Sequence, residues 1–455
     1  MNPNHSQLPD SKFTRRDFIK TTSTAAIGGT FAGALAGCSS SGKKAGVVAA
    51  TTVAGKAFAQ NDGTLKIALI GCGGRGSGAA NQALSADSNL TLVAVVDAFQ
   101  DRLEDCLKNL RKEHGDKVAV PEENKFVGFD GYIKAIALAD VVILATPPGF
   151  RPIHFEEAVK QGKHVFMEKP VAVDAPGVRR VLAAAEEAKK KNLKVGVGLQ
   201  RHHQLGYLET LDRLHGGAIG DIVAMRCYWN GGGVWVRPRQ TAQTEMEYQM
   251  RNWYYFNWLC GDHINEQHIH NLDVINWVKN GHPVRCHGMG GRQVRTGIDH
   301  GEIFDHHAVE YEYADGSHLF SQCEHIEGVW SSVSEHVIGT KGTCDVSSHV
   351  IRGANAWKFE KDGARDPYQQ EHDDLFKAIR SDKPYNEAEN GAKSTLTAIM
   401  GRMATYSGKV IEWDEALNSK IDLMPKVFAW DANPPTMPDK DGRYAIAIPG
   451  KTIAV

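Results

Sequence analysis

The feature that most constrains the fold is a glycine-rich turn between an apolar run and a run of small residues. Residues 65–70 have the length and apolar content of a buried strand, and residues 77–84 are typical of a helix. The turn between them fits the pattern G-x-G-x-x-G and contains Gly71, Gly73, Gly74, Arg75 and Gly76. In this pattern the glycines permit a tight turn, a close approach of backbone to a diphosphate, and close packing of helix on strand. Because the first N–H groups of the helix attract phosphates, the turn predicts a dinucleotide site.

A second apolar run, residues 90–96, ends at Asp97, about 20 residues beyond the turn. A carboxylate at this place accepts hydrogen bonds from the ribose of the adenosine. Its charge repels a 2′-phosphate, so Asp97 favours NAD over NADP. The alternative is a turn aspartate that caps the next helix.

A third apolar run, residues 140–145, is followed by Thr146 and Pro147, and His154 lies at the start of the next helical segment. Proline ends the strand and directs the chain across the carboxyl edge of the sheet, where open α/β sheets bind ligands. We therefore include Thr146, Pro147 and His154 among the candidate cofactor-binding residues. Apolar runs and helical segments alternate through residue 198, which predicts a doubly wound parallel sheet of the Rossmann type.

Residues 162–170, Gly-Lys-His-Val-Phe-Met-Glu-Lys-Pro, closely resemble a signature of the glucose–fructose oxidoreductase/inositol dehydrogenase (Gfo/Idh/MocA) family. Residues 195–201 resemble the segment that closes the nucleotide domain of this family, and residues 371–413 look like its final helices. The resemblance extends over roughly residues 64–415.

The resemblance implies a two-domain α/β enzyme that acts on a carbohydrate. Residues 64–200 would form the NAD-binding Rossmann domain. Residues 201–455 would form an α+β substrate-binding domain with a large, mostly antiparallel open sheet. In this family the exposed face of that sheet pairs subunits, so we expect a homodimer or homotetramer.

By the same resemblance, Lys169 lies beside the nicotinamide and the reacting hydroxyl of the substrate. A lysine at that place acts as a proton donor or base and stabilises developing alkoxide charge. The alternative is a solvated surface lysine, the usual fate of this residue type. Glu168 and Gln200 lie in the two matched segments and complete the candidate cofactor set.

A second family signature, D-x-x-x-H-x-x-D, is matched best by residues 266–273. Glu266 and His270 are four residues apart and would share one face of a helix, with Asp273 further along it as a substrate residue. His270 would accept the proton or orient Lys169 and the substrate, unless it is an ordinary core histidine. Glu266 replaces the usual aspartate, and it could hold the imidazole, bind a sugar hydroxyl or serve an altered reaction.

Residues 228–258 are rich in tryptophan and tyrosine. Aromatic rings stack on the apolar faces of sugars, while arginines bond their hydroxyls. The alternative is that these rings belong to the core or to a subunit interface. The candidate substrate residues in and before this stretch are Arg201, Trp235, Arg237, Trp253 and Tyr254.

Histidines and carboxylates cluster around the second signature. They are Asp262, His263, His268, Asp305, His306 and His307. Such clusters can bind metal, but their spacing matches no zinc signature and the family generally needs no metal, so we expect none.

Composition excludes several other classes. The formal net charge of −2 offers no basic surface for nucleic acid. The eight cysteines are irregularly spaced without a C-x-x-C pair, which excludes a zinc finger or a small disulfide scaffold.

The N-terminus has the form of a bacterial twin-arginine export signal. Residues 14–20, Thr-Arg-Arg-Asp-Phe-Ile-Lys, precede a small-residue apolar run, 25–36, that is too short to span a membrane. Residues 35–38, Leu-Ala-Gly-Cys, resemble a lipobox that would lipidate Cys38 and make residues 39–63 a tether. A competing cleavage site precedes Gln60. We expect a periplasmic protein with a lipid anchor to the membrane.

Export also restricts the chemistry, because the periplasm does not supply free NAD. The cofactor would have to travel bound and be recycled in place. We expect oxidation of a sugar or glycoside hydroxyl, with C3 the expected carbon, by a tightly held cofactor. The alternatives are a redox-neutral NAD-dependent glycoside hydrolase and a sugar-binding protein without catalysis.

Overall fold

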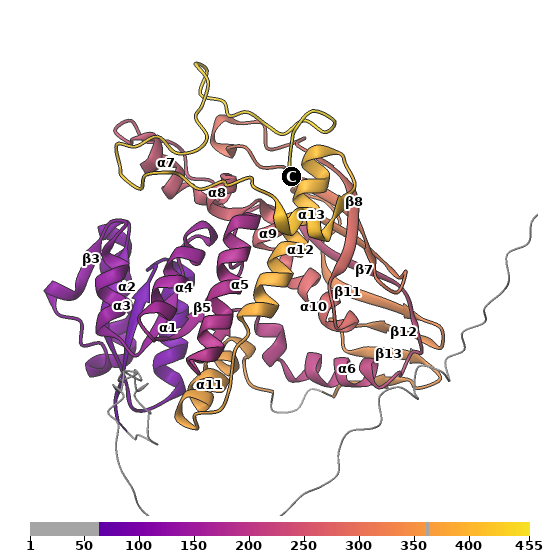
Figure 1. The fold of residues 1–455 in the computed structure, drawn as a ribbon, viewed down its shortest axis with the longest axis horizontal. Helices are drawn as coiled ribbons and strands as arrows, with labels where there is room; N and C mark the ends of the chain where they lie inside the picture. The colour runs from indigo at the N-terminus through magenta and orange to yellow at the C-terminus, as the bar shows by residue number, and fades with distance from the viewer. Residues whose placement is uncertain (1–62, 361–363) are drawn as a thin grey trace, which may run out of the picture. The chain divides into compact units, whose positions relative to one another are not determined.

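A computed structural model of the protein describes residues 63–360 and 364–455 (Figure 1). The predicted export signal, the lipobox with Cys38 and nearly all of the predicted tether lie outside the described residues. Within the described ranges no helix is both long enough and apolar enough to cross a membrane. The seven cysteines of these ranges are buried and unpaired.

The first half of the described chain contains a six-stranded sheet in which all neighbours are parallel, in the order β3-β2-β1-β4-β5-β6. The strands are β1 (Leu65–Ile70), β2 (Leu90–Asp97), β3 (Lys125–Val127), β4 (Val141–Leu144), β5 (His164–Met167) and β6 (Val195–Val197). This confirms the predicted doubly wound sheet. The order reverses between β1 and β4, and a crevice at the carboxyl ends of the strands is expected there.

Helices cover both faces of this sheet, because alternate residues of the strands point to opposite sides. Ile67 and Leu69 of β1 pack with α1 (Gly74–Ala86) and α2 (Gln100–His114). Ala68 and Ile70 pack toward the other face. That face is covered by α3 (Gly131–Leu138), α4 (Arg151–Lys160) and α5 (Ala175–Lys190).

The helix α5 shows why the sequence folds locally as it does. Asp174 caps its N-terminus by accepting a 2.8 Å hydrogen bond from the Gly177 N–H, and Pro176 lies in the first turn. Lys189 and Lys190 lie in the last turn, where positive charge complements the helix dipole.

A late segment of the chain returns to this first sheet. The helix α11 (Pro367–Arg380) buries Leu375, Phe376 and Ile379 in the same apolar cluster as α1 and α2. The nucleotide-binding half is therefore completed by residues far beyond position 200.

The second half contains a nine-stranded sheet in the order β14-β13-β12-β11-β7-β10-β9-β8-β15, antiparallel throughout except for the β7–β10 pair. The strands are β7 (Ile222–Gly231), β8 (Pro283–Gly291), β9 (His306–Tyr313), β10 (His318–His325), β11 (Ser332–Gly339), β12 (Gly342–Asp345), β13 (Val350–Gly353), β14 (Trp357–Lys358) and β15 (Ile411–Glu412). The predicted large, mostly antiparallel sheet is thus confirmed.

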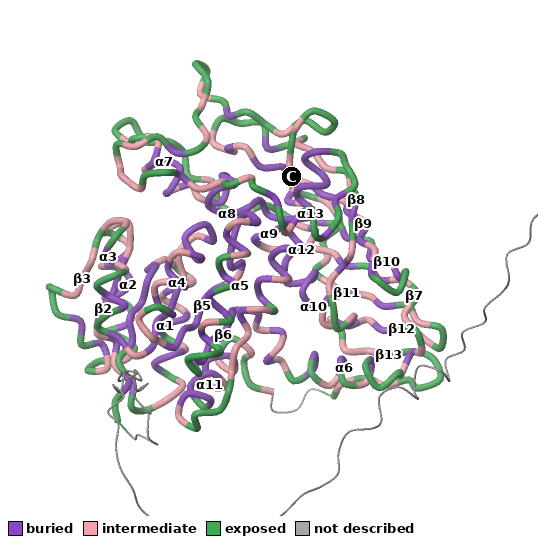
Figure 2. Tube along the Cα trace, viewed as in Figure 1, coloured by how far each residue is buried: buried purple, intermediate pink, exposed green. Residues whose placement is uncertain are grey.

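One face of this sheet packs on helices and the other is exposed. The covering helices include α6 (Leu205–His215), α10 (Ile269–Lys279), α12 (Ala388–Ser407) and α13 (Trp413–Asn418). The helix α12 packs on both α5 and β8 and is buried along nearly its whole length (Figure 2). The exposed face carries Met289, Phe320 and Ile338.

A third apolar cluster lies around the short helices α7 (Glu245–Arg251) and α8 (Asn257–Cys260), which precede α9 (His263–Glu266). The irregular C-terminal segment, residues 419–455, passes along this region and is called the C-terminal strap below (Figure 1, yellow). Its side chains join the same cluster through Leu423, Met424, Phe428, Trp430 and Tyr444.

Candidate active site

A cavity of about 680 Å³ opens at the carboxyl edge of the parallel sheet and is lined by both halves of the described chain. All twelve predicted cofactor residues line it, namely Gly71, Gly73, Gly74, Arg75, Gly76, Asp97, Thr146, Pro147, His154, Glu168, Lys169 and Gln200. From the second half, the predicted residues Arg201, Trp235, Arg237, Trp253, Glu266 and His270 also line it. Tyr254 and Asp273 do not.

The glycine turn has the geometry that a diphosphate cradle requires. Gly71 has φ +97°, and a side chain there would come within 2.6 Å of the Ala145 backbone. A Cβ at Gly76 would overlap the Gly71 carbonyl oxygen. At Gly73 and Gly74, by contrast, a Cβ would meet no atom within 4 Å, so these two glycines leave space on the cavity side of the turn. The turn therefore fits a dinucleotide whose diphosphate lies against Gly73 and Gly74.

This contrast predicts opposite outcomes for two alanine substitutions. Gly73→Ala should leave the unfolding temperature nearly unchanged but weaken NAD binding by about 10-fold or more, because its methyl group occupies the approach to the backbone. Gly76→Ala should lower the stability by about 1–3 kcal/mol through overpacking. Thermal unfolding and NADH titration of both variants check this, and parental NADH affinity in Gly73→Ala would contradict the cradle.

The position of Asp97 is compatible with both of the roles that the sequence suggests, a ligand of the adenosine ribose and a capping residue of the turn. Its carboxylate accepts hydrogen bonds from the Cys72 N–H in the glycine turn (2.7 Å) and from the Phe99 N–H (2.9 Å). Burial raises the pKa of this carboxyl group. Each oxygen still has a lone pair for a ligand hydroxyl. Asp97 is thus a turn-capping residue that also faces the cavity.

The other cofactor candidates are joined by a residue that the sequence did not single out, Arg151. Its buried guanidinium donates hydrogen bonds to the carbonyl oxygens of Thr146 (2.6 Å) and Glu168 (2.9 Å), which fixes two strand-end loops to each other. Burial and Arg151 lower the pKa of His154 to about 3, so its imidazole is neutral. The only sequence signal for Arg151 was its place directly after the β4 loop.

Arg75 does not extend freely into the cavity. Its guanidinium donates to the Glu168 carboxylate and lies 3.7 Å from Glu371 of α11. Burial and the charge of Glu168 raise the pKa of Glu371 well above its ordinary value. Arg75 therefore contacts one carboxylate that lines the cavity, Glu168, and a second, Glu371, that is buried outside the lining and favours the protonated form.

Lys169 lies just beyond the end of β5 and is partly buried. Its ammonium group donates hydrogen bonds to the backbone carbonyl of Glu266 (2.6 Å) and to the carboxylate of Glu266 (3.2 Å). Only 12% of the Lys169 side chain and 10% of the Glu266 side chain are exposed, which excludes the solvated surface lysine. Burial raises the pKa of Glu266, and Lys169 opposes this shift.

His270 is a neutral imidazole in the same cavity. Burial, together with the charges of Lys169 and Arg201, lowers its pKa well below the ordinary value. Its Nδ1 has no hydrogen-bond partner, and its ring stacks on Trp229 at 5.9 Å. A neutral imidazole next to cationic groups can accept a proton from a substrate hydroxyl.

The expected continuous helix over residues 266–273 is wrong. The chain forms two helices, α9 ending at Glu266 and α10 beginning at Ile269. Asp273 is buried in α10, where it accepts hydrogen bonds from Ser394 (2.7 Å) and Asn390 (3.0 Å) and pairs with His202. It holds helices together and does not contact the cavity.

The aromatic stretch divides between core and cavity. Trp229, Trp235 and Trp253 line the cavity, and Trp235 packs edge-on against Trp253 at 5.8 Å. Tyr254 is buried behind them and contacts Trp235 and His325, so its prediction as a substrate residue is corrected. Trp229 is a lining residue that was not among the predicted substrate contacts.

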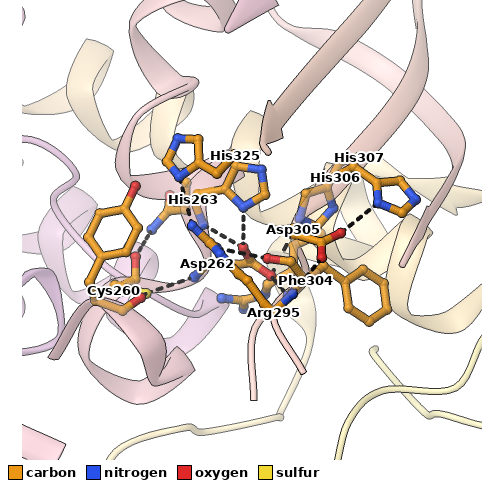
Figure 3. A network of polar contacts seen from close by, with 12 residues as sticks. Cys260, Asp262, His263, Arg295, Phe304, Asp305, His306, His307 and His325 are labelled. Atoms are coloured by element: carbon orange, nitrogen blue, oxygen red, sulfur yellow. Dashed lines mark hydrogen bonds and ion pairs between the residues drawn. The ribbon is translucent and has the colours of Figure 1, made fainter. Parts of the chain in front are cut away.

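The histidine and carboxylate cluster is a buried hydrogen-bond network (Figure 3). Asp262, His263 and His307 place three potential metal-ligand atoms within 4.8 Å of one another. Asp262 already accepts hydrogen bonds from the Tyr406 hydroxyl (2.5 Å), the Phe304 N–H (3.0 Å), and the N–H and ring of His263. Burial alone would raise the pKa of Asp262, but His307 and His263 lower it well below its ordinary value.

We interpret this network as support for the active site. The Asp262 side chain caps α9, and its backbone has a φ of +70° at the bend that precedes this helix. Because α9 ends at Glu266, the network holds the carbonyl and carboxylate that bind Lys169. Asp305 supports the neighbouring loop by accepting from three successive N–H groups, those of residues 293–295.

The fold and cavity are those of a two-domain α/β protein with a nucleotide-binding half. Residues 65–198 match the model of the Gfo/Idh/MocA oxidoreductase family, NAD-binding Rossmann fold. This match covers the nucleotide-binding half of the described chain.

Two inositol dehydrogenases are similar to this chain over a longer stretch. Inositol 2-dehydrogenase of Ralstonia nicotianae is 28% identical over 269 residues, which cover 58% of this chain and 69% of that protein. The Azotobacter vinelandii inositol 2-dehydrogenase is 26% identical over 369 residues, covering 76% of this chain and 95% of that protein.

Solved structures share the fold across both halves. The aldose–aldose oxidoreductase of Caulobacter crescentus superposes with a TM-score of 0.61 at 18% identity, covering 77% of this chain and 99% of that one. The Lactobacillus casei scyllo-inositol dehydrogenase with bound NAD(H) and scyllo-inositol gives a TM-score of 0.58 at 19% identity, with the same coverage.

Proposed function

We propose that this protein is an exported, NAD-dependent oxidoreductase that oxidises a ring hydroxyl, with C3 the expected carbon, of a sugar or glycoside and keeps its cofactor bound. The supporting observation is that the Lys169–Glu266 pair and the neutral His270 line the same cavity as the glycine turn. The relatives named above act on inositol or aldoses, which favours a polyhydroxylated ring as substrate. The carboxylate of Asp97 favours NAD over NADP.

Each group of residues in the cavity has its own role in the proposed oxidation. The glycine turn and Asp97 would hold the dinucleotide, which supplies the hydride acceptor. The imidazole of His270 takes the proton of the substrate hydroxyl. The ammonium of Lys169 stabilises the negative charge that develops on that oxygen, and Glu266 holds Lys169 in place. Trp229, Trp235 and Trp253 offer faces for the sugar ring.

The products of a sugar and glycoside panel test the proposal. The purified protein is incubated with each compound and the products are identified by mass spectrometry, with the Lys169→Met variant as control. A keto-sugar formed only by the parent supports the oxidation. A released aglycone without net oxidation would instead identify the redox-neutral hydrolase, and binding without any product would identify a sugar-binding protein.

We further propose export by the twin-arginine route to the periplasm and a lipid anchor at Cys38. The intact mass of the mature chain tests the anchor, because an unmodified chain that begins at Gln60 would contradict it. We also propose a homodimer or homotetramer that covers the exposed sheet face around Phe320. Light scattering of the purified protein measures that assembly.

A further inference from the structure

The C-terminal strap contacts residues that line the cofactor cavity through two aromatic side chains, Phe428 and Trp430. The ring of Trp430 lies 5.2 Å from Phe99 and 4.6 Å from Phe129. The ring of Phe428 lies 6.1 Å from Phe129 and 5.3 Å from Phe150. Such ring pairs attract each other beyond the simple burial of apolar area.

The three rings that the strap contacts come from three strand-end loops of the parallel sheet. Phe99 follows β2, Phe129 follows β3 and Phe150 follows β4, and all three line the cavity. Phe99 lies two residues beyond Asp97, so Phe99 and Phe129 belong to the adenosine side of the predicted dinucleotide site. Phe428 and Trp430 do not line the cavity themselves and act on it through these rings.

A second contact holds Phe99 from the other half of the chain. Arg251 of α7 lies 3.7 Å from the centre of the Phe99 ring. The same guanidinium pairs with both carboxylate oxygens of Asp101 in α2, at 2.7 and 2.9 Å. Phe99 is therefore contacted by Arg251 and by the strap, neither of which belongs to the Rossmann core.

The strap is fixed to both halves on either side of these aromatic residues. The Leu423 N–H donates to the buried Asp174, the cap of α5, at 2.8 Å. Further along, the Thr436 carbonyl accepts from Gln249 of α7 at 2.7 Å, and the Tyr444 hydroxyl lies 3.0 Å from Arg239. The strap thus spans from the nucleotide half to the α7 region.

We propose that the C-terminal strap retains the cofactor by holding the adenosine wall of the cavity closed. Phe99 and Phe129 move aside for the nucleotide to leave, and they do so only when their contacts with Trp430 and Phe428 are broken. Phe428 and Trp430 are thus positioning residues for a bound dinucleotide. The inference rests on the proposed function, in which this cavity holds NAD.

The test measures the release of NADH from the full-length mature protein. The protein is loaded with NADH, mixed with excess NAD, and followed by the loss of NADH fluorescence. Trp430→Ala and Phe428→Ala should each release NADH about 10-fold faster, because they remove the ring contacts that close the wall. Their kcat at saturating NAD should stay within about twofold of the parent, while KM for NAD rises.

Three comparisons distinguish failure of this inference from failure of the proposed function. Val427→Ala, at an exposed position of the same strap, should release NADH at the parental rate. Trp430→Phe should restore slow release, and it replaces the alanine variant if that variant does not fold. Parental release rates in both Trp430 and Phe428 variants would overturn the inference while NADH binding by the parent still supports the proposed function. A parent that binds no NADH at all would overturn both.

Discussion

Replacing Lys169 with alanine should lower kcat by about three orders of magnitude, the range that positioned acid–base and electrostatic groups supply. The substitution removes the only side chain paired with Glu266 by an ion pair in the described part of the site. Because burial already raises the pKa of Glu266, the carboxyl group left behind should take up a proton and remain buried as a neutral acid. The protein should therefore fold and bind NADH while losing turnover.

Initial rates under saturating substrate, with NADH titration on the same samples, measure this effect. Lys160→Ala is the matched control, because that side chain is 76% exposed on α4 and pairs only at the surface. It should leave kcat unchanged. Turnover by Lys169→Ala at the parental rate would remove Lys169 from the mechanism.

Replacing His270 with alanine should lower kcat by about 10²–10⁴-fold, and the pH profile of the parent should identify the reason. A protonated imidazole accepts no proton, so kcat/KM falls only as the pH drops through the pKa of His270. Burial, Lys169 and Arg201 hold that pKa well below its ordinary value of about 6.5. The activity plateau should therefore continue below pH 6.5 on the acid side.

The profile of kcat/KM between pH 5 and 8 checks this expectation, and added imidazole should restore part of the activity of His270→Ala. An acid limb centred near 6.5 in the parent would contradict the buried, neutral base. A plateau that is unchanged in shape and height in His270→Ala would assign the proton to another group.

Most of the fold could be predicted from the sequence because its signals are local. The glycine turn, the apolar runs and the segment around Lys169 each specify one strand end, and parallel strands bring their carboxyl ends to one edge. That edge is where the structure places the twelve predicted cofactor residues.

The predictions about the site were wrong where the same local sequence pattern is compatible with more than one structure. Periodicity predicted a single helix through Glu266 and His270, but α9 ends at Glu266 and α10 begins at Ile269. The composition of the aromatic stretch indicates a substrate site, but it does not show which rings point into the cavity. The prediction therefore includes Tyr254, which does not line the cavity, and omits Trp229, which does. The strap has neither helical nor strand periodicity, and its contacts join positions more than 300 residues apart.

The return of α11 to the first sheet has a consequence for synthesis on the ribosome. The apolar cluster on one face of the parallel sheet includes Leu375, Phe376 and Ile379. Its other residues lie much nearer the start of the described chain. Until those residues leave the ribosome, the N-terminal layer exposes an apolar surface. A fragment that ends near residue 200 would keep this surface exposed. Maturation of the nucleotide pocket is therefore a late event, finished only after translation of most of the polypeptide.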